Sequence, residues 1–191
     1  MRITGGSWRG RRLAVPRGRD VRPTNDRVRE ALFAILQHND FGRPGGPVLP
    51  GDETRVLDAC AGSGALGLEA LSRGAAHATF LDTDAAALAA CRANLRALGI
   101  ADRATALSAD ALRPPRPAAP VAIAFLDPPY FSGLGPQALT ALAKAGWLAL
   151  GAICVVEHAA RERFAAPEGF ELLDERHYGA AGIALVRWRG G

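Results

Sequence analysis

Residues 56–75 read VLDACAGSGALGLEALSRGA, and this stretch decides the fold. A short apolar segment carries Asp58 near its end, and Gly62, Gly64 and Gly67 follow it in the spacing G-x-G-x-x-G. Glycines in this spacing let a strand turn sharply into a helix and let the backbone approach a nucleotide-like ligand at the helix N-terminus. The stretch therefore predicts a strand, a ligand-binding turn and a helix.

Apolar segments alternate with helical patterns along the rest of the chain. We expect strands over 55–60, 78–81, 104–107, 121–126 and 152–157, and helices over 24–37, 65–73, 84–98 and 134–145. Strands that alternate with helices form a parallel sheet covered on both faces. Two closing strands, 170–177 and 183–188, have no helix between them and so form an antiparallel hairpin. The sequence predicts a Rossmann-like α/β fold with a seven-stranded, mostly parallel sheet.

The N-terminal region differs in composition from the remainder. Residues 1–30 hold nine arginines against three acidic residues, a net charge of +6, whereas the whole 191-residue chain is +4. Residues 1–22 mix Gly, Pro and Arg and predict a basic arm or hairpin outside the packed core, before one domain over 23–191 that contains a turn-rich linker at 41–53. Clustered arginine fits either an RNA or DNA contact surface or a solubilising tail.

Several classes of protein are disfavoured by composition. The sequence has no apolar run long enough to cross a bilayer, so we expect no membrane association. Three widely spaced cysteines indicate free thiols in a reducing cytoplasm, and the four scattered histidines show no metal-ligand spacing. No heptad or exposed apolar stripe argues for self-association, so a monomer is the simplest expectation.

Acidic residues follow three successive predicted strands, at Asp58, Asp82 and Asp110. A carboxylate at Asp58 would repel a pyrophosphate but suits a ligand that carries an ammonium and a sulfonium. Asp82, eighteen residues after Gly64, is placed to accept hydrogen bonds from ribose hydroxyls, and Asp110 lies at a depth suited to the adenine amino group. These positions predict S-adenosyl-L-methionine as the cofactor, although the glycine motif alone also fits a nicotinamide dinucleotide.

The fourth apolar strand is followed by the tetrapeptide Asp127-Pro128-Pro129-Tyr130. Consecutive prolines hold the backbone carbonyls in a stiff loop. A carboxylate beside a carbonyl can accept both hydrogens of a planar amino group, which turns the nitrogen lone pair towards the methyl donor. Tyr130 is suited to stacking on a base swung out into the pocket. The motif predicts methylation of an exocyclic amino group on a nucleic-acid base.

Nearly the whole chain resembles the RsmD-type 16S rRNA guanine-N2 methyltransferases, which have the class I methyltransferase fold. The matching segments are RITGGSWRGRRL (2–13), RPTNDRVREALFAIL (22–36), the glycine block and FLDPPY (125–130). The resemblance implies that the cofactor site is lined by Asp58, Gly62, Gly64, Asp82 and Asp110, and that the target guanine is held by Asp127, Pro128, Pro129 and Tyr130. It implies docking of 16S rRNA, within a small-subunit particle or assembly intermediate, by Arg2, Arg9, Arg11, Arg12, Arg22 and Arg27. Relatives often carry Glu where this chain has Asp82.

Three other functions remain open on the residues alone. An adenine-N6 methyltransferase on RNA or DNA would use the same Asp-Pro-Pro-Tyr chemistry. A nicotinamide-dependent oxidoreductase would use the glycine motif but leaves residues 127–130 unexplained. An RNA-binding module without catalysis would not need the three carboxylates.

Overall fold

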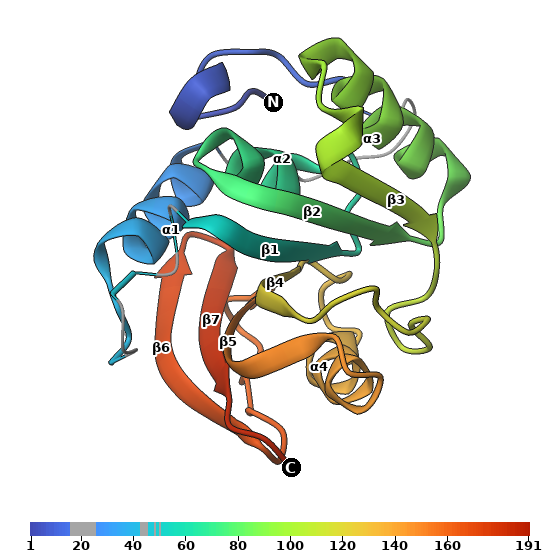
Figure 1. Ribbon diagram of the computed structural model, residues 1–191. Helices are drawn as coiled ribbons and strands as arrows, with labels where there is room; N and C mark the ends of the chain where they lie inside the picture. Colours follow the sequence, from blue (N-terminus) through green and yellow to red (C-terminus); the bar gives the residue numbers. More distant parts are fainter. Residues whose placement is uncertain (16–25, 43–45, 48, 50) are drawn as a thin grey trace.

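A seven-stranded sheet with the order β3-β2-β1-β4-β5-β7-β6 forms the centre of the molecule (Figure 1). The computed structural model describes residues 1–15, 26–42, 46, 47, 49 and 51–191, without the side chain at position 52. The strands are β1 (Gly51–Ala59), β2 (Ala75–Asp82), β3 (Ala104–Ser108), β4 (Val121–Leu126), β5 (Leu148–Ala159), β6 (Phe170–Tyr178) and β7 (Ala181–Trp188). The helices are α1 (Asp26–His38), α2 (Ala65–Ser72), α3 (Ala85–Leu98) and α4 (Leu134–Lys144), with short 3₁₀ turns at Gly6–Trp8 and Ala101–Arg103.

Strand direction confirms the predicted fold class. Strands β1 to β5 pair in parallel, whereas β7 runs antiparallel to both β5 and β6. The chain moves outwards from β1 to β3 and then returns to β4 on the other side of β1. Ligands bind open α/β sheets at such a reversal, beyond the carboxyl ends of the strands. The glycine turn and the Asp127 loop follow β1 and β4, so they flank this crevice.

The helices cover the two faces of the sheet unequally (Figure 1). Helices α1, α2 and α3 pack on one face, where Phe33 and Leu68 join Phe125 of β4 in one apolar cluster. Helix α4 packs on the other face, where Leu139 and Leu142 contact the second apolar cluster. Because side chains alternate along a strand, each buried strand contributes to both clusters.

Element boundaries shift by a few residues from those expected. Strand β1 begins at Gly51, inside the segment expected to be a linker, and its register with β2 breaks between Gly51 and Arg55. The predicted N-cap of α3 is confirmed, because an Asp84 carboxylate oxygen accepts a hydrogen bond of 2.8 Å from the Ala86 amide. The cap expected for α1 at Thr24 or Asn25 lies outside the described residues.

The expectation that the N-terminal arm stays outside the core is wrong for residues 1–15. Residues 2 and 12 form an antiparallel bridge, with Ile3 and Leu13 only 1% and 7% exposed in the core cluster beneath α1–α3. Pairing the two ends of this segment turns one apolar side chain from each inwards. The arginines obscured this pattern, because within residues 1–15 only Ile3 and Leu13 are buried.

Glu69 of α2 anchors this arm. Its side chain is fully buried and accepts hydrogen bonds from the Thr4 amide (2.8 Å), the Thr4 hydroxyl (2.7 Å) and the Gly5 amide (2.8 Å). The same carboxylate pairs with Arg73 at 2.8 Å and with the fully buried Arg29 of α1 at 3.4 Å. One buried carboxylate therefore joins the arm, α1 and α2.

Candidate active site

The glycine turn between β1 and α2 is built for close approach. Gly62 and Gly64 have φ angles of 55° and 81°, in the left-handed region that favours glycine. A Cβ on Gly67 would lie 2.4 Å from Cε1 of Phe80 in β2, so only glycine lets α2 pack this closely on the sheet. A Cβ on Gly62 would meet nothing within 4 Å, which leaves this part of the turn accessible to a ligand.

Asp58 lies at the base of this turn and is 1% exposed. The Gly67 amide at the start of α2 donates to its Oδ2 at 2.8 Å. Burial raises the pKa of Asp58 from its ordinary 3.8 to about 7; the charge of Asp82 adds to the rise and the amide hydrogen bonds oppose it. A carboxylate held in this way gains from a cationic neighbour, which favours its ionised form.

The other two predicted cofactor carboxylates lie at the end of β2 and just after β3. Asp82 is half-buried and accepts hydrogen bonds of 2.8 Å from the amides of Gly62 and Asp84, which fix it beside the glycine turn. Asp110 is exposed, and its Oδ1 accepts from the Leu112 amide at 2.9 Å.

Cys60 shows that all the predicted acidic residues converge. It is half-buried, with a φ of 63° that is unusual for a non-glycine residue. The pKa of its thiol is raised to about 12, mainly by burial and also by the charges of Asp82, Asp127, Asp58 and Asp110. Four carboxylates from the ends of four strands therefore act on one point. The crevice is electronegative, as a cationic ligand requires and as a pyrophosphate would not tolerate.

Asp58→Asn should change how stability depends on pH. A raised carboxyl pKa means that the folded state binds the proton more tightly than the unfolded state, so the free energy of unfolding falls as pH rises from about 4 to about 7. Asn keeps an acceptor for the Gly67 amide but does not titrate. The free energy of unfolding of the variant should therefore rise relative to that of the wild type as pH increases, by up to about 4 kcal/mol at pH 8. Urea unfolding of both proteins at pH 4.5 and pH 8 measures this, and a difference that stays constant with pH would contradict it.

The Asp127–Tyr130 loop leaves the carboxyl end of β4 beside this crevice. The pKa of Asp127 is raised well above its ordinary value. Burial is the largest cause, and the charges of Glu157 and Asp58 add to it. Pro128 is buried and Pro129 is exposed, and the Pro129 carbonyl accepts a hydrogen bond from the Ser132 hydroxyl at 2.5 Å. The Tyr130 hydroxyl donates to Oε1 of Glu157 at 2.7 Å, which orients the ring.

Sequence reasoning missed Glu157. This residue is 6% exposed at the carboxyl end of β5, after the apolar run Ile153–Val156. A charged residue that ends an apolar strand was the available signal, since Asp58 ends its strand in the same way. Phe131, next to the motif, is 71% exposed with a φ of 57°, and strained bulky residues of this kind concentrate at functional sites.

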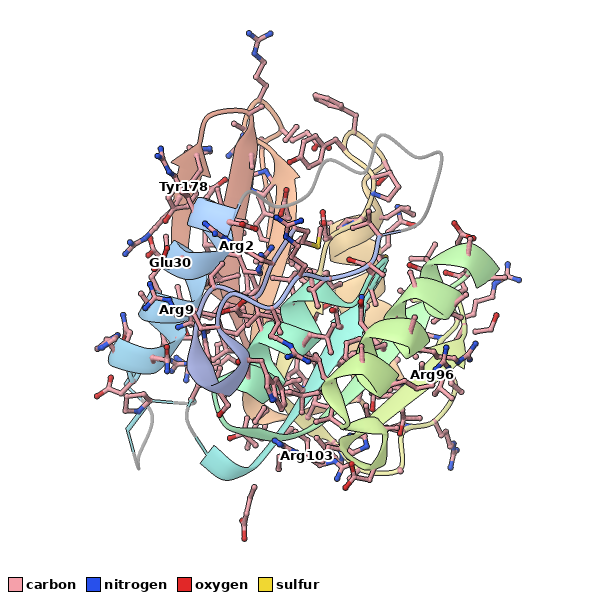
Figure 2. The ribbon with its side chains drawn as sticks, turned by 90° about the horizontal axis from the view of Figure 1, so that it is seen from above. Arg2, Arg9, Glu30, Arg96, Arg103 and Tyr178 are labelled. Carbon is pink, nitrogen blue, oxygen red and sulfur yellow. The ribbon has the colours of Figure 1, made fainter. Side chains whose placement is uncertain are left out.

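The described arginines predicted to contact RNA lie on the arm and on α1. Arg9, Arg11, Arg12 and Arg27 are exposed. Arg2 is exposed and pairs with Asp26 at 3.2 Å. Arg22 lies outside the described residues. Seen from above (Figure 2), the labelled Arg2 and Arg9 of the arm lie towards α1, and Arg96 lies on α3 at the other side of the view. The Arg103 guanidinium lies 5.9 Å from the Trp8 ring centre.

Neither a metal-binding cluster nor a membrane-crossing helix occurs in the described part of the chain. Its His, Cys, Asp and Glu side chains form no group of three that could hold a metal ion. Within the same residues, no helix combines the length and apolar character needed to cross a membrane.

The strand order and the glycine turn, with acidic residues at successive strand ends, define the class I methyltransferase fold. The chain belongs to the family described as "Conserved hypothetical protein 95", whose model matches residues 1–187, and the RsmD-type resemblance is confirmed. It is 35% identical to the ribosomal RNA small subunit methyltransferase D of Haemophilus influenzae, over 98% of this chain and 93% of that protein. The solved structure of the Escherichia coli methyltransferase yhhF superposes with a TM-score of 0.82 at 37% identity, covering 100% and 99% of the two chains. An RNA methyltransferase from Salinibacter ruber in complex with S-adenosyl-L-homocysteine shares the fold at 13% identity, with a TM-score of 0.64 over 88% and 95% of the chains.

Proposed function

We propose that this protein transfers a methyl group from S-adenosyl-L-methionine to the exocyclic N2 of a guanine in 16S rRNA. The observation that carries the proposal is the Asp127 loop at the edge of a crevice where four carboxylates converge on Cys60. The names of the relatives support small-subunit rRNA as the substrate. We further propose that the protein acts as a cytoplasmic monomer on a small-subunit particle or assembly intermediate.

The crevice fits the proposed cofactor. Asp58 and its neighbours offer negative charge to a ligand with an ammonium and a sulfonium, and the amide-held carboxylate of Asp82 offers acceptors for ribose hydroxyls. Asp110 is the candidate acceptor for the adenine amino group. Gly62 and Gly64 let the backbone approach the ligand closely. When bound, S-adenosyl-L-methionine supplies the methyl group.

The Asp127 loop positions the nitrogen that is methylated. Asp127 accepts one hydrogen of the guanine amino group and a backbone carbonyl accepts the other. We assign this role to the carbonyl of Pro128, the residue directly after Asp127, since one lone pair of the Pro129 carbonyl is already used by the Ser132 hydroxyl. Holding both hydrogens frees the nitrogen lone pair and directs it at the methyl carbon. Tyr130 stacks on the base in an orientation fixed by Glu157.

In this proposal the arm of residues 1–22 docks the RNA and residues 23–191 carry out the transfer. Replacing Arg9, Arg11 and Arg12 together with Ala should weaken RNA binding and flatten its salt dependence, by about one unit of slope for each phosphate that an arginine no longer neutralises. Binding to small-subunit RNA between 50 and 300 mM salt measures the slope. The double variant Arg116→Ala/Lys144→Ala is the control, because it removes exposed charges from other surfaces. An equal loss in control and arm variants would remove the arm from the RNA interface.

The proposed function is tested by transfer of a labelled methyl group to small-subunit particles that lack modifications, followed by nucleoside mass analysis. N2-methylguanosine in the small-subunit RNA is expected. N6-methyladenosine would retain the fold and cofactor and replace the substrate, and an unlabelled RNA would refute rRNA methylation.

A further inference from the structure

Glu157 lies level with Asp127 on the neighbouring strand. Strands β4 and β5 run side by side (Figure 1) and pair Leu126 with Val156 in parallel register, so Asp127 and Glu157 are the next residues along each strand. Phe125 and Val155 both face the core beneath α1–α3. Glu157 continues this alternation in β5 and faces the same side.

The position of Glu157 is costly for folding. A carboxylate that is 6% exposed loses its hydration, and the nearby Asp127 is a second group of the same charge. The hydrogen bond from Tyr130 orients the ring but could be made by a neutral Gln as well. A buried like-charge pair at a reactive loop indicates a functional role.

Guanine is the base that two adjacent acceptors recognise. Its Watson–Crick edge places the N1–H donor beside the N2 amino group, whereas adenine places a bare N1 acceptor beside its N6 amino group. A second carboxylate next to Asp127 would therefore bind guanine favourably. With adenine, its lone pair would face the lone pair on N1, which is repulsive. Because a carboxylate has about four acceptor positions, Glu157 can hold Tyr130 and accept a further hydrogen together.

The Glu157 carboxylate already contacts the Asp127 loop, because its Oε1 accepts a hydrogen bond of 2.7 Å from the Tyr130 hydroxyl. Resting on the proposed function, we infer that Glu157 selects guanine by accepting the N1–H of the target base while Asp127 and the Pro128 carbonyl hold its N2. In this inference Glu157 contacts both the target base and the Tyr130 hydroxyl.

The test compares two RNA substrates that differ at the methylated position. One carries guanosine and the other 2-aminopurine ribonucleoside, which keeps the 2-amino group but has no hydrogen on N1. Both are ligated into small-subunit RNA at the site located by mass analysis of RNA fragments, and kcat/KM is measured on reconstituted particles. The wild type should prefer guanine by on the order of 100-fold, because 2-aminopurine leaves the buried carboxylate facing an acceptor.

Glu157→Gln should lower that preference at least tenfold, since Gln can donate to the bare N1 of 2-aminopurine. Comparing ratios across enzymes cancels losses that come from the missing O6 of 2-aminopurine. Tyr130→Phe is the matched control, because it removes the hydroxyl that contacts Glu157; it should lower both rates and keep the ratio. Thermal stabilisation by S-adenosylhomocysteine verifies that each variant is folded.

Each remaining outcome is decisive. If Glu157→Gln had the same guanosine-to-2-aminopurine ratio of kcat/KM as the wild type, Glu157 would not read the base. The same conclusion would follow if Tyr130→Phe lowered this ratio as much as Glu157→Gln does. Either result would leave guanine methylation itself intact. A wild type that methylates guanosine and 2-aminopurine equally would lead to the same conclusions. Methylation of adenine in place of guanine would overturn both this inference and the proposed function.

Discussion

Replacing Asp127 with Ala is expected to lower kcat for methyl transfer on the order of 10³-fold, while the affinity for S-adenosylhomocysteine changes little. In the proposed mechanism this side chain holds the amino group that is methylated, whereas the Gly62 turn and the Asp82 carboxylate are left in place. Removing one group that orients and stabilises the reacting atoms costs this much in other enzymes. Single-turnover transfer measures the loss, and calorimetric titration with S-adenosylhomocysteine measures the affinity.

Asp127→Asn is the matched control, because it keeps a carbonyl acceptor at the same place. It should retain more activity than the Ala variant. Burial and the charge of Glu157 raise the pKa of Asp127, so wild-type transfer should fall as pH drops through that raised pKa. The Asn variant should lack this fall. Loss of S-adenosylhomocysteine binding in Asp127→Ala would instead place Asp127 in the cofactor site.

Replacing Glu69 with Ala is expected to lower the free energy of unfolding by about 3–5 kcal/mol, because it removes the buried carboxylate that pairs with both Arg73 and the buried Arg29, and leaves Asp26 as the described acidic partner of Arg29. It also removes the acceptor for the amides of Thr4 and Gly5. The arm should lose protection first, since these bonds hold it to α2. Urea unfolding gives the stability, and hydrogen exchange at residues 3–13 reports on the arm.

Glu30→Ala is the comparison for this variant, because Glu30 is an exposed acidic residue on α1. It should change the free energy of unfolding by no more than about 0.5 kcal/mol. If Glu69→Ala were as stable as Glu30→Ala, the buried network would make no net contribution. Exchange that is faster everywhere, and not at the arm first, would show that Glu69 stabilises the domain without holding the arm.

The fold could be predicted because its main signals are local. Apolar strands, the glycine turn and the Asp84 cap each occupy a few consecutive residues, and the closing hairpin follows from a missing helix. The start of β1 could not be predicted, because Gly51 pairs with Ala75 across a register break and sits in a turn-rich segment. Long-range pairing outweighed local composition there.

Site residues that belong to a sequence motif could be predicted, whereas residues whose role depends on their buried tertiary contacts could not. Asp58, Asp82, Asp110 and Asp127 each lie at the end of a strand or just beyond it, and the structure brings them around Cys60. Glu157 and Glu69 look like ordinary residues of a strand and a helix, and only the fold reveals what they contact. The arginine count likewise treats Arg29 as surface charge, although its side chain is fully buried.

The arm has partners far along the chain, which affects the order of events during synthesis. Thr4 bonds to Glu69, 65 residues later, and Ala14 bonds to Asn94, 80 residues later. At 5–20 residues per second, roughly 4–16 s separate the appearance of Ala14 from that of Asn94. During this interval Ile3 and Leu13 have no completed core to enter, so the nascent chain exposes them. The arm is therefore made well before the residues that hold it in place.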